Sequence, residues 1–308
     1  MKLFKEILEL GDISISKIED YRIKQLEKLK KRTVNGIIVG AFVIAASFYI
    51  AQDMHEIWVL GVGVVLGVVL FFIFRGNIRT QIKNAIKEQI VKKLIEGINP
   101  GFKYYPKQHI TEETFDDSKL IGNYTYLEGE DLFKGIYNNI PVEFSEIEVT
   151  KKASKSTKTL FEGPFYSLKV NKPFKGRTSV VPDFSEKNFG KIGRVFQSLN
   201  LYKDTLITID NEAFEKQFAI YTTNEDEAKE ILTQKLMNFL LEEKKSTNGV
   251  FFGFSMNNIY FGKYNSKDLY RVNIEAKITE KIIKRFYNEI LQHLQVVEKL
   301  YKLVLSQE

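Results

Sequence analysis

Two apolar stretches, VNGIIVGAFVIAASFYIA at residues 34–51 and IWVLGVGVVLGVVLFFIF at residues 57–74, decide the architecture of this chain. Each has about 18 residues, so as a helix each would span about 27 Å, close to the ~30 Å hydrocarbon thickness of a bilayer. A helix satisfies its own backbone hydrogen bonds, as a segment inside lipid must. The two stretches therefore predict a transmembrane helical hairpin over residues 34–74, with residues 52–56 as its connector.

The charge around the hairpin predicts its orientation. The connector has no Lys or Arg, whereas both outer flanks are basic. Because basic flanks stay on the cytoplasmic side, we expect a two-span membrane protein with both termini and the bulk of the chain in the cytoplasm. A pair of buried helices in a soluble core would not need this asymmetry, and a signal peptide would not follow more than thirty residues of mixed charge. The basic residues expected at the membrane surface are Lys28, Lys30, Lys31, Arg32, Arg75, Arg79 and Lys83.

Small residues recur every four positions in both stretches. Gly36 and Gly40 form one such row, and Gly63 and Gly67 form another. Rows of this kind allow helix backbones to approach closely. They predict tight packing of the hairpin on itself, with a homo-oligomer as the alternative use.

The remaining chain divides into three further segments. Residues 1–33 are predicted as cytosolic amphipathic helices and residues 75–100 as a basic juxtamembrane helix, whose isoleucine and leucine residues recur every four positions until Asn99-Pro100-Gly101. The segment from Arg75 to Ile98 has six basic and two acidic residues. Such a band is attracted to anionic lipids of the inner leaflet, and it gives no reason to expect nucleic-acid binding. Residues 101–308 are predicted as a cytosolic α+β domain.

Short β-rich runs separated by Gly, Asn and Asp predict a largely antiparallel sheet in this domain. Asn138-Asn139 indicates a two-residue hairpin turn, and the parity of the apolar residues that follow suggests a bulge near Ser145-Glu146. A long C-terminal helix is expected from about Thr279. The predicted strands cover 124–127, 132–137, 141–150, 159–170, 177–181, 205–209, 214–221, 250–254, 258–262 and 269–274. The expected fold class is therefore α+β, with a transmembrane hairpin followed by an antiparallel sheet and packed helices.

Candidate chemistry is sparse. Cys is absent, and the three His residues show no metal-ligand spacing, so no cofactor, metal site or catalytic residue is predicted. Residues 128–131 are expected to form an acidic turn between strands, and the polar loop before residue 180 has an Arg and hydroxyl groups suited to a phosphate or carboxylate. The basic stretch 151–158 is expected to be a loop. The ligand or partner site considered from these features comprises Glu130, Asp131, Glu146, Arg177, Thr178 and Asp183.

Several short motifs carry a resemblance to a known family. They are YLEGED at 126–131, FSEI at 144–147, FEGPF at 161–165, FKGRT at 174–178 and FEKQFAIY at 214–221. Over most of residues 30 to 300 the chain resembles an uncharacterised bacterial family of two-span membrane proteins with a cytosolic domain of unknown function. Members are often encoded beside LemA-type membrane proteins, so the resemblance implies a LemA-type partner. It also implies a location in the bacterial cytoplasmic (inner) membrane, and it implies no catalytic residues.

These observations favour a membrane-anchored, non-enzymatic module whose cytosolic domain binds another protein. The alternative is a membrane-tethered enzyme or a sensor of a small ligand or lipid headgroup, using the loop around Arg177 and the nearby carboxylates. Convergence of those side chains in one pocket would favour the alternative, and their dispersal would disfavour it.

Overall fold

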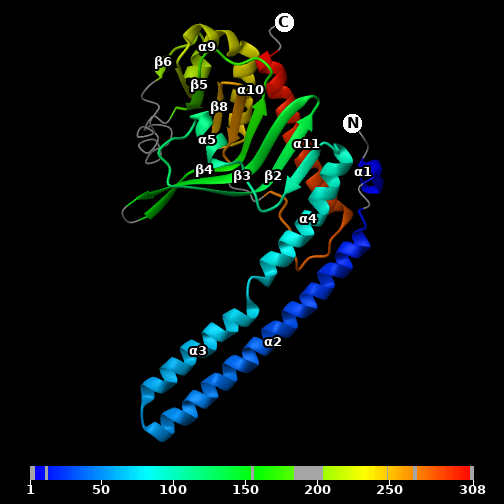
Figure 1. Ribbon diagram of the computed structural model, residues 1–308, viewed down its shortest axis with the longest axis vertical. Helices are drawn as coiled ribbons and strands as arrows, with labels where there is room; N and C mark the ends of the chain where they lie inside the picture. The colour runs from blue at the N-terminus through cyan, green and yellow to red at the C-terminus, as the bar shows by residue number, and fades with distance from the viewer. Residues whose placement is uncertain are drawn as a thin grey trace. The chain divides into compact units, whose positions relative to one another are not determined.

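The structure is a computed structural model that describes residues 4–10, 13–153, 156–183, 204–247, 249–265 and 269–305 (Figure 1). The chain forms two compact units. One contains residues 4–93 and 270–286, and we call it the helical unit. The other contains residues 94–269 and 287–308 together with the first three residues, and we call it the sheet unit.

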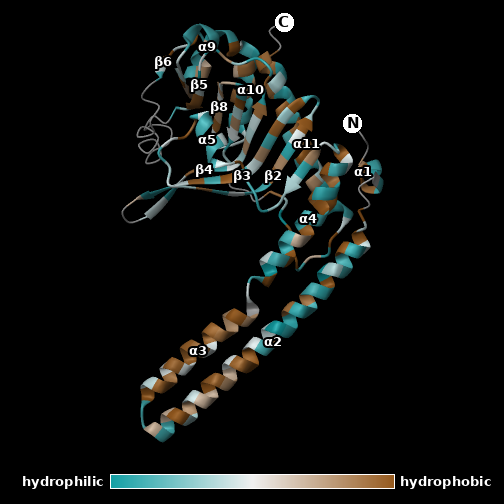
Figure 2. Ribbon diagram, in the orientation of Figure 1, coloured by the Kyte–Doolittle hydropathy of each residue, from teal (hydrophilic) through white to brown (hydrophobic). Residues whose placement is uncertain are grey.

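Four helices of the N-terminal hundred residues are α1 (Phe4–Leu10), α2 (Ile15–Met54), α3 (Ile57–Arg75) and α4 (Ile78–Ile98). Helix α2 begins at the N-cap Ser14, whose hydroxyl accepts a hydrogen bond from the backbone N–H of Lys17. It then continues without a break for 40 residues, so the amphipathic segment and the first apolar stretch form one helix. Helices α2 and α3 are long and apolar enough to cross a membrane. Figure 2 shows their apolar parts alongside one another.

The predicted packing of the hairpin on itself is confirmed. A Cβ atom built on Gly40 would lie 3.0 Å from the carbonyl oxygen of Gly67, and one on Gly67 would lie 2.9 Å from that of Gly40. At Gly63 a Cβ would overlap the Ser47 side chain. The glycine rows of the two helices therefore face each other, and the backbones approach as closely as glycine allows.

The sheet unit contains a nine-stranded sheet in the order β1-β2-β3-β4-β9-β8-β5-β7-β6. Every strand pair between described residues is antiparallel. The strands are β1 (Phe102–Tyr105), β2 (Tyr126–Tyr137), β3 (Ile140–Ala153), β4 (Ser156–Lys169), β5 (Thr178–Pro182), β6 (Thr205–Ile207), β7 (Phe218–Thr222), β8 (Val250–Ser255) and β9 (Asn258–Lys263). The α+β class is thereby confirmed.

The other helices are α5 (Glu112–Ser118), α8 (Glu212–Glu215), α9 (Glu225–Ile231), α10 (Gln234–Lys245) and α11 (Glu280–Leu305). Helix α11 is the predicted C-terminal helix, and one side of it is buried from its first turn to its last, at Ile283, Phe286, Ile290, Leu294, Val297 and Val304. Neither β1 nor α5 was predicted, because each is too short to show a clear period.

The central strands are buried on both faces. Phe165 of β4 packs on Phe115 of α5 with ring centroids 5.1 Å apart, whereas its neighbour Tyr166 points to the other face and meets His293 of α11. Because helices cover both faces, the sheet does not need the polar alternation of a half-exposed sheet. This explains why Val142 and Ile147, which have opposite parity, are both buried without the bulge expected in β3.

Besides the bulge expected in β3, four local predictions were wrong. Residues 214–217, expected to begin a strand, lie instead in α8 and the turn that follows it, and β7 begins at Phe218. Residues 128–131 are not a turn but part of β2, where a bulge at Asp131 (φ +63°) restores the register opposite β3. Of residues 151–158, the described ones extend β3 and β4 into a ribbon rather than forming a loop; residues 154 and 155 lie outside the described residues. Residues 269–274 form no strand. The turn at Asn138-Asn139 is confirmed, since both residues have positive φ and connect the paired Tyr137 and Ile140.

Candidate functional site

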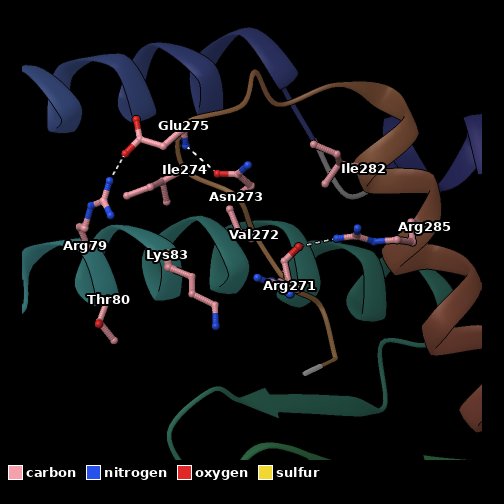
Figure 3. Close-up of a pocket in the computed structure, with 10 residues that line it drawn as sticks. All are labelled: Arg79, Thr80, Lys83, Arg271, Val272, Asn273, Ile274, Glu275, Ile282 and Arg285. Atoms are coloured by element: carbon pink, nitrogen blue, oxygen red, sulfur yellow. Dashed lines mark hydrogen bonds and ion pairs between the residues drawn. The ribbon is translucent and has the colours of Figure 1, made fainter. Parts of the chain in front are cut away.

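A charged pocket of the helical unit lies beside α4, soon after the end of α3 (Figure 3). It is an open groove of about 540 Å³. Its charged lining residues are four basic ones, Arg79, Lys83, Arg271 and Arg285, and one acidic one, Glu275. We call it the juxtamembrane groove. Arg79 and Lys83 come from α4, Arg271 and Glu275 from the segment before α11, and Arg285 from the first turns of α11.

The segment that closes the groove is held in place by helix α2. Glu19 and Arg22, one helical turn apart, form an ion pair of 2.6 Å and are almost fully buried. Arg22 also donates a hydrogen bond of 2.7 Å to the carbonyl of Ile274, and Glu19 accepts one of 2.9 Å from the backbone N–H of Ile278. These two contacts, with the buried Val272 and Ile274, fix an irregular segment that has no strand or helix of its own.

The electrostatics of this anchor follow from its hydrogen bonds. The Arg22 side-chain hydrogen bond is the largest influence on Glu19 and holds the pKa of its carboxyl at about 2; the backbone hydrogen bond from Ile278 acts in the same direction. The same pair raises the pKa of Arg22. Both groups are therefore charged at neutral pH, and the segment is held by charge-assisted hydrogen bonds.

Within the groove the basic side chains are partly engaged. Arg79 forms an ion pair with Glu275, and Arg285 donates a hydrogen bond to the carbonyl of Arg271 (Figure 3). Lys83 and Arg285 interact with further groups of the protein. Arg271 is exposed, and among the residues that the structure describes its guanidinium makes no hydrogen bond or ion pair. The groove thus carries a surplus of positive charge with N–H donors to spare.

In the sheet unit, three of the carboxylates considered from the sequence converge. Glu130 and Glu146 are directly opposite each other on β2 and β3, and the bulge adds Asp131. One oxygen of each lies within 4.8 Å of one oxygen of the other two. Tyr104 donates a 2.5 Å hydrogen bond to Asp131, the backbone N–H of Leu269 donates one of 3.2 Å to Glu146, and all three carboxylates have further partners in the protein. Each of the three carboxylates therefore has at least one partner within the protein, while Oδ2 of Asp131 accepts no hydrogen bond from a described residue.

The Arg177 loop lies elsewhere in the sheet. It precedes β5, which is separated from β3 by β4, β9 and β8, or about 19 Å at the usual strand spacing. Arg177 forms two hydrogen bonds with the buried Asp204, one of them 2.9 Å from its Nε. The backbone N–H groups of Lys175 and Gly176 donate to Glu227 at 2.8 and 2.7 Å. The loop does bind carboxylates, as its composition suggested, but they belong to this chain.

The last two residues considered for the site are also apart from the carboxylates. Thr178 is buried and shares a 2.8 Å hydrogen bond with Thr222 of the neighbouring β7. Asp183 follows β5, and its backbone N–H donates to Gln217. Its charge opposes the burial that lowers the pKa of Lys244 to about 8. The structure thus brings together the three carboxylates but not the Arg177 loop.

The basic residues expected at a membrane surface lie on two helices. Lys28, Lys30, Lys31 and Arg32 are exposed on α2, before its apolar part. Arg79 and Lys83 line the juxtamembrane groove, and Arg75 is the last residue of α3, with its side chain outside the described part. Sequence reasoning missed Arg271 and Arg285, because nothing in the local pattern links them to α4.

Comparison with known proteins identifies the C-terminal part of the chain only at the level of an uncharacterised domain. Residues 159–302, from β4 into α11, match a family described as protein of unknown function (DUF3137). No curated protein matches the sequence. A solved structure, the mycobacterial trehalose monomycolate transport factor A, TtfA, aligns with 72% of this chain and 95% of its own at 8% identity, with a TM-score of 0.36. A likeness at that level carries no argument about function.

Proposed function

We propose that this protein is anchored in the bacterial cytoplasmic membrane by the α2–α3 hairpin and that its α+β domain binds another protein at the cytoplasmic face. The observation that carries the anchoring is the contrast between the two sides of the hairpin. Glycines line its inner contact, while Phe42, Ile57 and Trp58 are 74%, 86% and 61% exposed. Soluble proteins rarely expose an apolar surface of this extent, whereas lipid would cover it.

The basic flanks support the orientation. The exposed residues from Lys28 to Arg32 precede the first apolar stretch, and Arg79 and Lys83 follow the second. Between them, only His55 and Glu56 separate α2 from α3. With positive residues retained in the cytoplasm, both termini are cytoplasmic and the connector lies outside.

A binding role for the domain, rather than an enzymatic one, is supported by the interactions that its carboxylates and Arg177 already make within the chain. Each carboxylate of the cluster has a partner in the protein, and Arg177 is paired with Asp204. The loop and the carboxylates do not share a site, which disfavours the enzyme or sensor alternative built on them. The family resemblance points to a LemA-type membrane protein as the partner. Since the glycine rows are used within the hairpin, a homo-oligomer would need another surface.

The orientation is tested by labelling single cysteines, which is straightforward because the chain has none. Asp53→Cys lies near the connector, and Ser156→Cys lies at the exposed start of β4. A membrane-impermeant maleimide applied to intact spheroplasts should label only the first, and both after permeabilisation. Labelling of Ser156→Cys in intact cells would reverse the orientation, and equal labelling in a soluble fraction would exclude the anchor.

The binding role is tested by purifying the tagged chain from native membranes in mild detergent and identifying what co-purifies by mass spectrometry. The control is residues 1–100 alone, which keep the hairpin and lack the sheet. A stoichiometric companion that follows the full chain but not the control supports a binding domain, and a LemA-type companion supports the proposed partner. A companion that follows both would place the contact in the hairpin. A full chain without companions would contradict the proposal.

A further inference from the structure

The juxtamembrane groove gathers positive charge from three parts of the helical unit that are far apart in the sequence. Its four basic residues outnumber its single acidic residue, Glu275, which is paired with Arg79. The Arg285 guanidinium, which has five N–H donors, gives one to the carbonyl of Arg271 and is thereby fixed toward the groove. The hydroxyl of Thr80 lines the same groove. Arginine, lysine and hydroxyl donors around one space are the usual partners of a phosphate group.

The groove is held in its shape by buried residues outside it. The segment that contributes Arg271 and Glu275 is fixed to α2 by the buried Arg22 and Glu19. Buried Val272 and Ile274 alternate with the exposed Arg271, Asn273 and Glu275, so the apolar side holds the segment while the polar side faces the groove. The donors are therefore positioned before any ligand arrives, which lowers the entropic cost of binding.

The position of the groove along the chain matches the depth of lipid phosphates. Helix α3 ends at Arg75, and the chain leaves the helical conformation at Gly76 and Asn77 before α4 begins at Ile78. Arg79 therefore lies four residues beyond the end of α3, and Lys83 lies about 6 Å further along α4 at 1.5 Å per residue. The headgroup layer on each side of the hydrocarbon is about 5–8 Å thick. If α3 crosses the membrane, Arg79 lies at headgroup level and Lys83 just beyond it.

We propose that the juxtamembrane groove binds a phosphate group, presented by the headgroup of an anionic phospholipid or by a soluble phosphate compound. Arg271 and Lys83 contact the phosphate, and Arg79 contributes when Glu275 turns away or is neutralised. The lipid form rests on the membrane anchoring proposed above, whereas phosphate recognition rests only on the groove. This site is distinct from the Arg177 loop and the carboxylates considered from the sequence.

The test uses the full chain, purified in neutral detergent and reconstituted in phosphatidylcholine nanodiscs that contain increasing phosphatidylglycerol. The dissociation constant for phosphatidylglycerol is measured by native mass spectrometry. Arg271→Gln and Lys83→Gln should each weaken binding about fivefold, the effect of one basic charge near a membrane surface. Glu275→Gln should strengthen it by a similar factor, because it removes the acidic competitor. Lys281→Gln, an exposed residue of α11 outside the groove, is the charge-matched control and should change nothing.

A second arm separates the two sources of phosphate. Glycerol 1-phosphate and inorganic phosphate are titrated into the chain in phosphatidylcholine nanodiscs, with the same four variants. Binding of phosphatidylglycerol alone identifies a lipid headgroup site, and equal binding of glycerol 1-phosphate identifies a soluble ligand; both support phosphate recognition. Loss of affinity that is the same for Lys281→Gln as for Arg271→Gln, or no effect of Glu275→Gln, overturns the groove as the site.

Carbonate extraction separates the membrane-anchor proposal from the groove proposal. Failure of the chain to remain in membranes after carbonate extraction would refute the anchor and leave the soluble titrations as the test of the groove. Stable anchoring without any response of the groove variants would refute the groove alone.

Discussion

The contact between Gly40 and Gly67 offers the sharpest test of the hairpin. Each glycine lies against the carbonyl oxygen of the other, with 3.0 and 2.9 Å available to a Cβ atom. The obstacle on both sides is backbone, which cannot rotate away as a side chain would. Gly40→Leu therefore has to push the two helices apart, and so does Gly67→Leu.

The magnitude follows from two opposing terms. Replacing Gly by Leu inside a helix gains nearly 1 kcal/mol of helix propensity. Overpacking a close contact costs about 1–3 kcal/mol, and more when backbone has to move. Gly61→Leu is the matched control, since it lies in α3 and a Cβ there meets nothing within 4 Å. The difference between Gly40→Leu and Gly61→Leu cancels most of the propensity term and should be about 1–3 kcal/mol of destabilisation.

The assay is unfolding of the detergent-solubilised chain by increasing mole fraction of sodium dodecyl sulfate. Trp58 is the only tryptophan and lies in the first turn of α3, so its fluorescence reports on the hairpin directly. Gly40→Leu and Gly67→Leu should unfold at clearly lower detergent fractions than Gly61→Leu. If Gly40→Leu and Gly61→Leu unfolded at the same detergent fraction, the face-to-face glycine packing would be refuted.

Three further outcomes are expected outside the two apolar stretches. The folded-state pKa of Glu19 is about 2, below the ordinary 4.5, so its contribution to the free energy of unfolding is present above about pH 4.5 and is lost as the pH falls toward 2. Glu19→Gln should therefore cost about 2 kcal/mol at pH 7, measured by urea unfolding, and should weaken the loss of stability between pH 4.5 and 2. An unchanged loss in that range would exclude the Glu19–Arg22 pair as its cause. Burial lowers the pKa of His293 from 6.5 to about 4, so it is neutral when folded and the domain should lose stability as the pH falls from 6.5 to 4. His293→Leu should remove this pH dependence, but it should cost about 1–3 kcal/mol of stability because the Tyr166 hydroxyl loses this hydrogen-bond partner. In urea unfolding, the double variant with Tyr166→Phe should recover part of that stability. In the same measurement, Gly163→Ala should destabilise the protein by more than about 3 kcal/mol, because φ is +142° and a Cβ would lie 2.3 Å from a carbonyl oxygen of β9. If the variant were as stable as wild type, the backbone at Gly163 would differ from the one described.

Local signals were strong enough to predict the elements that depend on neighbours in sequence. Unbroken apolar runs and paired glycine rows indicated two helices that pack on each other, and the structure has that contact at Gly40 and Gly67. A repeat of apolar residues every three or four positions indicated α11, and Asn138-Asn139 indicated a turn with positive φ. In each case a few adjacent residues fix the conformation, so the sequence alone contains the information.

Sequence patterns led to wrong predictions where contacts with a distant part of the chain set the local conformation. Parity of apolar residues in β3 suggested a bulge there, but helices bury both faces of the sheet and the bulge is at Asp131 of the partner strand. The acidic residues 128–131 resembled a turn, yet pairing with β3 holds them in β2.

The candidate sites show the same division. Residue order alone indicates that basic residues follow the second apolar stretch and that the Arg177 loop has carboxylate-binding chemistry. The carboxylates that bind this loop, Asp204 and Glu227, are brought to it by the folded chain. Folding likewise brings Arg271 and Arg285 to Arg79 in one groove, across nearly two hundred residues. Residues 270–279 have no conformational preference strong enough to fix them. Hydrogen bonds to Arg22 and Glu19 hold them instead, and these contacts exist only once the chain has folded.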